Sequence, residues 1–325
     1  MAAMDTSLLS VRVTAKRQVA QDTICLELSP LDQAGLPAFL PGAHIDVHAP
    51  GGLIRQYSLL NDCTRHAHYR IGVLREAQSR GGSVALHDRV QVNDILQISA
   101  PRNRFALVPA TRSLLFAGGI GVTPLLCMAR QLQAQGADFA LHYSSRTRAR
   151  AAFLDEAQAL SAARVHAYFD DDPTQVLDAA AVLAGADAQT HLYVCGPAGY
   201  IDFVCAQARA AGFDDTRIHV EHFALDAADR PAITDQDVAF QVQLASTGEI
   251  FDIPADESIT SALDRQGVFI PVSCEEGICG TCLTGLQGGI PDHRDTYLTD
   301  GEHAANDQFT PCCSRAKTPM LILDL

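Results

Sequence analysis

The sequence predicts a protein of three domains: an antiparallel β-barrel, a doubly wound α/β domain and a small α+β domain. Residues 1–106 contain many short strand-like runs and no long helical pattern, which is typical of a small barrel. Residues 107–228 alternate apolar strand-like runs with helical runs, the pattern of a parallel sheet covered by helices. Residues 238–325 return to short strands around a cysteine-rich loop, and the proline-containing residues 229–237 predict a linker.

The strands of the barrel are predicted from alternating or β-branched runs that turn residues separate. Pro41-Gly42 and Pro50-Gly51-Gly52 are typical turn sequences. We expect strands at 8–13, 23–28, 44–47, 56–60, 69–73 and 95–99.

Two stretches of the barrel carry residue types that bind phosphate or a flat ring. In Arg55-Gln56-Tyr57-Ser58, alternation along a strand places Arg55 and Tyr57 on one face and Ser58 on the other. An arginine beside an aromatic residue can pair with phosphate and lie against a planar group. In Ser79-Arg80-Gly81-Gly82-Ser83, two glycines before a predicted short helix expose N–H groups suited to phosphate. Each stretch alone also has a purely structural explanation, since a tyrosine in a strand usually serves packing and Gly-Gly usually forms a turn.

The α/β domain opens with a buried strand at 113–117 and a glycine turn, Gly118-Gly119-Ile120-Gly121-Val122-Thr123-Pro124. A glycine turn between strand and helix suits the pyrophosphate of a dinucleotide. Pro124 stands where the strict fingerprint has its last glycine. A second loop, Cys195-Gly196-Pro197, follows a later strand, and ligands of such sheets bind at these carboxyl ends. We expect further strands at 139–144, 165–169 and 191–195, and helices at 125–135, 151–160, 175–183 and 200–211.

The third domain is organised around Cys274, Cys279 and Cys282, spaced C-x4-C-x2-C, with Cys312 further on. This is the ligand spacing of a plant-type [2Fe–2S] cluster. Glycines inside the loop let the backbone wrap tightly around it. A zinc site or a set of buried thiols is the alternative, but zinc sites favour two C-x2-C pairs and the second pair is absent. Around the loop we expect strands at 239–245, 249–253 and 320–325 and a helix at 258–266.

The fourth ligand is ambiguous, because Cys312 and Cys313 are adjacent. We assign Cys312, since the side chain of its neighbour should point elsewhere in an extended segment.

Composition limits the classes of partner. The net charge of −14 argues against nucleic acid and against an anionic membrane. From Asp237 onward there are 14 acidic and 4 basic residues, a net charge of −10. Such a domain could dock on a basic surface, or its charge could simply aid solubility. The other cysteines are scattered and the first residues do not form a signal peptide, so we expect a reducing cytoplasm.

Together these motifs resemble a known family, and the likeness covers essentially the whole chain. The family is that of phthalate dioxygenase reductase, the reductase components of two-component Rieske oxygenases, and vanillate demethylase reductases are similar. The residues that carry the resemblance are Arg55-x-Tyr57-Ser58, Gly81-Gly82-Ser83, Gly118 to Pro124, Cys195-Gly196-Pro197, Glu221-His222-Phe223, Cys274, Cys279, Cys282, Cys312, Asp292-His293-Arg294-Asp295 and Ser314-Arg315-Ala316-Lys317.

The resemblance implies FMN on the barrel, NADH on the α/β domain and a [2Fe–2S] cluster in a plant-type ferredoxin domain. The choice of FMN over FAD comes from the resemblance alone. It also implies roles near the reacting groups for Cys195, Thr123 and Phe223, although a small buried cysteine or an apolar plug would explain two of them. The implied cofactor-binding residues are Arg55, Gln56, Tyr57, Ser58, Val73, Gly81, Gly82, Ser83, Gly119, Ile120, Gly121, Thr123, Asp170, Gly196, Pro197 and Phe223.

Two sequence features bear on the choice of nicotinamide coenzyme. Ser144-Ser145-Arg146 follows one strand of the α/β domain and could bind the 2′-phosphate of NADP. Asp170-Asp171-Asp172 ends the next strand, and carboxylates there suit ribose hydroxyls and repel a phosphate. We favour NADH.

The expected function is therefore electron transfer from NADH, through FMN and the cluster, to a Rieske-type oxygenase, by a monomer. No paired-carboxylate or Ser/His/Asp signature calls for another chemistry. The alternatives are a flavin reductase for a haem protein or ferric complex, and a redox sensor whose cluster state controls partner binding.

Overall fold

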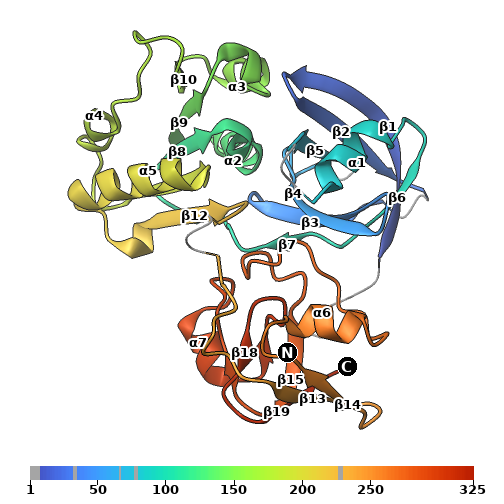
Figure 1. Cartoon of the computed structure of the whole chain (residues 1–325). Coiled ribbons are helices and arrows are strands. Elements are labelled where there is room, and N and C mark those ends of the chain that lie inside the picture. The colour runs from blue at the N-terminus through green and yellow to red at the C-terminus, as the bar shows by residue number, and fades with distance from the viewer. Residues whose placement is uncertain (1–7, 32–34, 66, 77–79, 226–229) are drawn as a thin grey trace. The chain divides into compact units, whose positions relative to one another are not determined.

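The computed structural model describes residues 8–31, 35–65, 67–76, 80–225 and 230–325. The chain forms two compact units, Met1–Phe223 and Ala224–Leu325, which we describe one at a time (Figure 1). The predicted barrel lies in the first unit, as does the predicted α/β region 107–228 up to Phe223.

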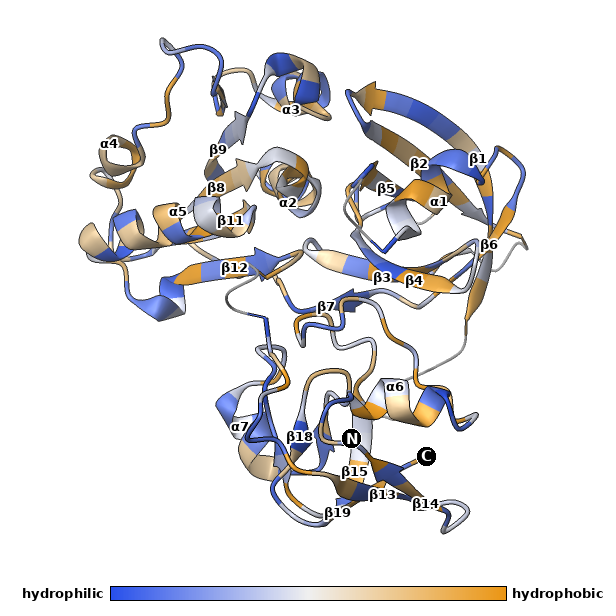
Figure 2. Cartoon of the chain, in the orientation of Figure 1, coloured by the Kyte–Doolittle hydropathy of each residue, from blue (hydrophilic) through white to orange (hydrophobic). Residues whose placement is uncertain are grey.

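The N-terminal half of the first unit is an antiparallel sheet that closes into a barrel. Its strands pair in the order β4-β3-β6-β1-β2-β5, and β7 pairs with β3. Closure comes from an antiparallel bridge between Leu59, just after β4, and Ile71 of β5. Polar and apolar residues interleave along β1, so that one face lies in the core (Figure 2). The strands are β1 Leu9–Ala20, β2 Thr23–Pro30, β3 Ala43–Ala49, β4 Leu53–Ser58, β5 Tyr69–Leu74, β6 Ile95–Ile98 and β7 Arg102–Asn103.

One short helix, α1 Gly82–Asp88, packs against the barrel. Leu86 of this helix is fully buried among barrel residues such as Val73 and Ile71. The helix therefore belongs to the barrel core, and its first residues are held in place by that packing.

The second half of the first unit is a five-stranded parallel sheet in the order β10-β9-β8-β11-β12. The first strand of this region, β8, lies in the middle, and the chain order reverses between β8 and β11. Ligands bind at such a reversal, beyond the carboxyl ends of the strands. The strands are β8 Arg112–Gly118, β9 Asp138–Ser145, β10 Val165–Phe169, β11 Thr190–Gly196 and β12 Ile218–His222.

Both faces of the parallel sheet are covered. Leu115 of β8 lies in a core with α2 and α3, and the next residue, Phe116, lies in a core with α4 and α5. This alternation, with strands buried on both sides, confirms the doubly wound fold. The helices are α2 Val122–Ala134, α3 Leu154–Leu160, α4 Ala179–Leu183 and α5 Ala198–Ala210, with short 3-10 turns at Gly119–Gly121, Arg148–Arg150 and Asp215–Arg217.

The second unit has a five-stranded sheet in the order β14-β13-β19-β15-β17 and a separate pair, β16 and β18. Its core includes Phe240, Leu263 and Phe309, together with Cys282 and Cys312. The elements are β13 Phe240–Leu244, β14 Ile250–Ile253, α6 Ile259–Asp264, β15 Thr284–Gly288, β16 Pro291–Asp292, α7 Asp300–Ala305, β17 Gln308–Phe309, β18 Arg315–Ala316 and β19 Met320–Leu323.

Differences from the expected elements have local causes. The strand expected at 8–13 continues to Ala20, because two bulges in the β1–β2 pairing interrupt the alternation that marks a strand. The helix expected at 175–183 begins only at Ala179, where Asp178 caps it. Strand β12 was not expected, because its polar residues hide the strand pattern. Strands β15 to β18 and helix α7 were not expected either, because they are too short for a periodic signal.

No helix in the described part of the chain has both the length and the apolar character that a membrane span requires.

Candidate functional site

Two glycine-containing loops meet at the carboxyl edge of the parallel sheet. One follows β8 and the other follows β11, and these strands are neighbours. A Cβ atom on Gly121 would lie 2.2 Å from the carbonyl oxygen of Cys195, and one on Gly196 would lie 2.9 Å from the Cα of Gly118. Only glycine allows this approach. The structure thus brings together five predicted residues, namely Gly119, Ile120, Gly121, Gly196 and Pro197.

Thr123 is the second residue of α2, the helix behind this edge, and is buried. Its Oγ1 donates a hydrogen bond to the carbonyl of Ile120 at 3.0 Å, which stabilises the turn. Its methyl group lies against β5, since a Cβ on Gly72 would be 2.8 Å from Thr123 Cγ2. Thr123 therefore sits where the barrel contacts the parallel sheet.

The same contact region holds three polar side chains, of which Ser58 and Cys195 are buried and Glu221 is half-buried. Ser58 Oγ, at the end of β4, donates to Glu221 Oε2 at 3.4 Å. The Cys195 thiol donates to the same oxygen at 3.9 Å. Desolvation raises the pKa of Glu221 to about 8, although both hydrogen bonds oppose the shift. Burial and the nearby Glu221 carboxylate raise the pKa of Cys195. Near neutral pH this group can thus hold a proton on Glu221.

Glu221 was not among the predicted site residues. It appeared only within the Glu221-His222-Phe223 motif, because the strand that carries it, β12, was not expected. In the structure Cys195 and Glu221 are direct partners across the β11–β12 pairing. The signal in the sequence that could have identified this site residue was an acidic residue, Glu221, within a strand of the sheet.

Phe223 ends the first unit, two residues beyond Glu221. Its side chain is 41% exposed, which is high for a large aromatic residue. An exposed aromatic face next to this polar group is available for stacking against a flat ring.

Residues of the predicted phosphate cradle lie close together on the barrel. A Cβ on Gly82 would lie 2.5 Å from Cγ of Arg55, so the arginine passes directly over the start of α1. Gly81 has a left-handed φ of 89°. Ser83 Oγ accepts a hydrogen bond from the backbone N–H of Glu76 at 3.1 Å. The predicted Ser79 lies outside the described residues.

Two further predicted residues of the barrel lie deeper. Burial raises the pKa of Tyr57, which follows Gln56 on β4. Val73 is fully buried in the barrel core. Contact between Val73 and a bound ring would therefore involve its backbone, whose carbonyl lies 2.9 Å from His87 Nε2.

The residues that bear on the choice of coenzyme are adjacent. The backbone N–H of Asp170, just after β10, donates to the carbonyl of Ser145 at 3.1 Å. Asp170 and Arg146 are both exposed at the carboxyl edge of the sheet.

In the second unit, the predicted cysteines come together. Cys274, Cys279 and Cys282 lie in the loop between α6 and β15, and Cys312 lies between β17 and β18. The thiol of Cys274 is within hydrogen-bonding range of those of Cys279 and Cys312, and the thiol of Cys312 is within range of that of Cys282. The neighbouring Cys274 thiol and burial raise the pKa of Cys279. A metal that binds here must therefore displace protons.

The backbone of this loop is shaped around the sulfur atoms. The N–H of Glu276 donates to Cys274 Sγ at 3.3 Å, and the N–H of Thr281 lies 3.5 Å from Cys279 Sγ. Gly277 and Gly280 have left-handed φ values of 75° and 68°. Four buried or half-buried thiols with N–H donors fit a [2Fe–2S] cluster.

Cys313 lies beside this set, and its thiol is within hydrogen-bonding range of that of Cys312. Its Sγ lies 3.3 Å from Thr310 Oγ1, and a Cβ on Gly277 would be 2.6 Å from it. The sulfur is therefore packed beneath the loop, among hydroxyl groups.

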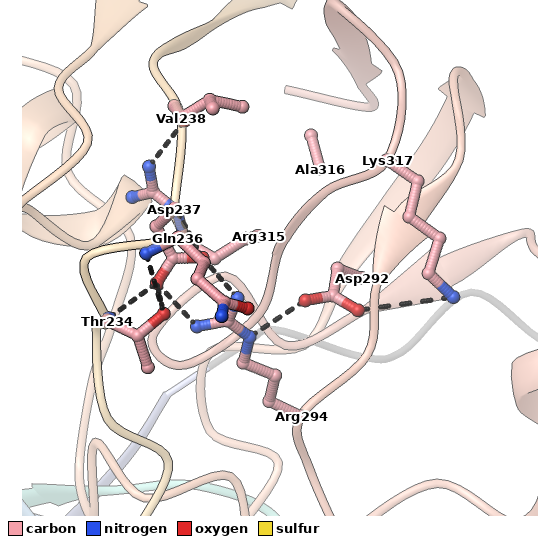
Figure 3. Close-up of a pocket in the computed structure, with 9 residues that line it drawn as sticks. All are labelled: Thr234, Gln236, Asp237, Val238, Asp292, Arg294, Arg315, Ala316 and Lys317. Atoms are coloured by element: carbon pink, nitrogen blue, oxygen red, sulfur yellow. Dashed lines mark hydrogen bonds and ion pairs between the residues drawn. The ribbon is translucent and has the colours of Figure 1, made fainter.

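Hydrogen bonds hold the segment before β13 against the β16–β18 pair (Figure 3). Arg294 donates to both carboxylate oxygens of Asp237 and to Asp292 Oδ2 at 2.9 Å. Arg315 donates to the carbonyls of Val238 and Pro254 at 2.9 and 3.0 Å. The hydrogen bonds from Arg294 lower the pKa of Asp237 to about 2. The end of the predicted linker is thus part of the second unit.

Comparison with known proteins bears on what these sites do. A 2Fe-2S iron-sulfur cluster binding domain matches residues 242–317, and the N-terminal domain of dimethylamine monooxygenase subunit DmmA-like proteins matches residues 101–218. A vanillate O-demethylase oxidoreductase from Pseudomonas sp. (strain HR199 / DSM 7063) is 50% identical over 98% of this chain and 100% of its own length. The crystal structure of phthalate dioxygenase reductase covers 98% of both chains, with 37% identity and a TM-score of 0.73. The chain belongs to the phthalate dioxygenase reductase family.

Two further similar proteins are a dioxygenase subunit and a longer monooxygenase. The phenoxybenzoate dioxygenase subunit beta of Ectopseudomonas oleovorans is 42% identical over 98% of this chain. An intact type IV self-sufficient cytochrome P450 monooxygenase has a TM-score of 0.83 and 34% identity, and this chain spans 41% of it. As a family member, the chain is an oxidoreductase that uses a flavin, a nicotinamide coenzyme and a [2Fe–2S] cluster.

Proposed function

We propose that this reductase takes electrons from NADH and delivers them, through FMN and the [2Fe–2S] cluster, to a Rieske-type aromatic-ring oxygenase or demethylase. The observation that carries this proposal is the 50% identity, over 98% of the chain, to vanillate O-demethylase oxidoreductase. A bound flavin accepts two electrons at once from a nicotinamide and passes them singly to an iron–sulfur cluster of about −400 mV.

The proposed roles of the barrel residues follow from their positions. Arg55 and the backbone of Gly81, Gly82 and Ser83 bind the flavin phosphate, because the arginine lies over the start of α1. Gln56, Tyr57 and Ser58 are on the adjoining strand and orient the flavin ring, next to the backbone of Val73.

The nucleotide is proposed to bind at the edge where β8 and β11 end. The close approach of Gly119–Gly121 to Gly196 and Pro197 allows a pyrophosphate to contact backbone N–H groups. Thr123 and Cys195 are beside this edge, and the exposed Phe223 would stack on the flavin ring when no nicotinamide is bound. The exposed Asp170 supports NADH over NADPH, since its carboxylate would repel a 2′-phosphate.

In the second unit, Cys274, Cys279, Cys282 and Cys312 are the proposed cluster ligands. Cys312 is supported over Cys313 because its thiol is in range of Cys274 and Cys282, whereas Cys313 bonds to Thr310. We also propose that the protein acts as a monomer in the cytoplasm. None of the ten cysteines, all within the described residues, forms a disulfide, which fits a reducing compartment.

The decisive experiment substitutes one proposed ligand, Cys279→Ser. NADH-dependent reduction of the flavin should be unchanged, while electron transfer to a Rieske oxygenase should be abolished. The control is Cys205→Ser, a buried thiol in α5. If Cys279→Ser still transfers electrons to the oxygenase, the electron route is wrong. An anaerobic NADH titration complements this test, because both flavin and cluster absorbance should bleach in the unsubstituted protein.

A haem protein is the second candidate acceptor. One relative, 37% identical over 98% of this chain, is a heme-dependent oxidative N-demethylase beta subunit, from Ectopseudomonas mendocina (strain ymp). Comparing the rate of electron transfer to a Rieske oxygenase with the rate to a haem demethylase distinguishes the two.

A further inference from the structure

Two histidines and an aspartate meet in the second unit, beside the cysteine loop, and the group includes no cysteine. His293 and Asp295 follow β16, and His303 lies on α7. Asp295 Oδ1 is 3.2 Å from His303 Nε2 and 3.6 Å from His293 Nδ1. One ligand atom from each of the three side chains lies within 4.8 Å of the other two. The two imidazole rings are 4.2 Å apart between their centroids.

The carboxylate of Asp295 is oriented by the backbone. Its side chain is fully buried, and its Oδ2 accepts a hydrogen bond from the N–H of Leu298 at 2.8 Å. Oδ1 therefore faces the two imidazoles and is the oxygen available to a ligand.

His293 gives the second, independent observation. Both of its ring nitrogens are buried, and neither has a hydrogen-bond partner among the residues that the structure describes. Its Nδ1 lies too far from Asp295 for a hydrogen bond. Burying a ring nitrogen without a partner is costly. A cation that accepts the lone pair of this nitrogen would remove that cost.

The donor types and spacing suit a divalent transition ion. Histidine nitrogen and carboxylate oxygen bind zinc at about 2.0–2.2 Å, so donors around a tetrahedral ion stand about 3.4 Å apart. The positive charge of Lys317 acts on His293 and opposes a cation, but Lys317 lies 4.0 Å from Asp292, which partly offsets it.

We propose that His293, Asp295 and His303 bind a zinc-type divalent transition ion, separate from the iron–sulfur cluster. The site uses nitrogen and oxygen ligands, and solvent completes its coordination beside the partly exposed His303. The ion joins α7 to the segment after β16. This segment supports the cysteine loop, because the N–H of Thr296 donates to the carbonyl of Gly277 at 3.1 Å. Bound metal therefore stabilises the second unit from beneath the loop.

The test uses the holoprotein, freed of loosely bound metal with a mild chelator and dialysed against Zn²⁺. Zinc and iron are then measured on the same sample. We expect one zinc ion per chain with the iron content unchanged. His303→Gln and His293→Gln should each weaken zinc binding at least about tenfold and leave iron unchanged. Both variants keep Asp295 and its hydrogen bond to Leu298.

The matched control is His219→Gln, which alters another close histidine pair, His191 and His219, whose ring nitrogens are 2.8 Å apart. This variant should bind zinc as the parent does. Zinc should also raise the melting temperature of the second unit in the parent and not in His303→Gln, and Mg²⁺ should have no such effect.

Three outcomes would overturn the proposal. Zinc could bind only as iron is lost, which would place it at the cysteines. It could be lost in His219→Gln and retained in His303→Gln. The parent could also bind no zinc at micromolar concentration, which would make the three residues a hydrogen-bonded network only.

Discussion

The Ser58 hydroxyl, on the last residue of β4, donates to the carboxylate of Glu221 on β12 at 3.4 Å. The barrel and the parallel sheet are thus joined by a polar contact at the edge where the nucleotide is proposed to bind. This contact and three other features lead to specific predictions.

Removing the charge of Glu221 should change how stability depends on pH. The folded-state pKa is raised to about 8, so protonated Glu221 stabilises the fold at low pH. That contribution is lost as the pH rises from about 4.5 through 8. In Glu221→Gln this loss of stability with rising pH should disappear, as measured by urea unfolding of the first unit between pH 5 and 9. The control Glu27→Gln, on the barrel surface, should keep the wild-type profile. An unchanged profile in Glu221→Gln would show that this carboxyl does not titrate in that range.

Filling the space above Gly82 should impair flavin binding. In Gly82→Ala the new methyl would lie 2.5 Å from Arg55 Cγ and displace the arginine. We expect flavin affinity to fall about tenfold or more, measured by fluorescence titration of the deflavinated protein. In Gly185→Ala the new methyl meets nothing within 4 Å, so this control should bind flavin normally. Equal affinities in the two variants would contradict the proposed cradle.

The adjacent cysteines Cys312 and Cys313 should differ in their effect on the cluster. Cys312→Ser should lose most of the iron and the visible absorbance of the cluster, because its thiol faces those of Cys274 and Cys282. Cys313→Ser should retain both, since serine can keep the contact with Thr310. Iron analysis and EPR of the reduced proteins distinguish the two, and a reversed result would reassign the fourth ligand.

The ion pair between Asp237 and Arg294 should stabilise the second unit above about pH 4. The pKa of Asp237 in the folded protein is lowered to about 2. The stabilisation is therefore present above the pKa of Asp237 in the unfolded chain and is lost as the pH falls through 2. Asp237→Asn should lower the free energy of unfolding by about 1–2 kcal/mol at pH 7. The difference between the parent and this variant should shrink toward pH 3. Asp264→Asn, at an exposed position on α6, serves as the control for chemical unfolding.

Some residues of the sites could be predicted from the sequence, and others could not. The cysteine spacing alone indicated the cluster, because ligand chemistry fixes which residue types must stand close together in the chain. Arg55 and Gly82 were each predicted, but their direct contact depends on how α1 packs on the barrel. Glu221 was missed because β12 is a polar strand whose partner, β11, supplies the apolar context. His303 gave no signal, since its significance comes only from the fold that brings it to Asp295.

Two glycines of the cysteine loop, Gly277 and Gly280, restrict which substitutions this part of the sequence can tolerate. A side chain at Gly280 would overlap the ring of Tyr297, and one at Gly277 would overlap Cys313 and Asp295. Both positions also require a left-handed backbone, so a smaller neighbour would not rescue a substitution. In a saturation-mutagenesis library these two positions should be as intolerant as the ligands themselves. The metal site thus constrains residues whose side chains do not bind the metal.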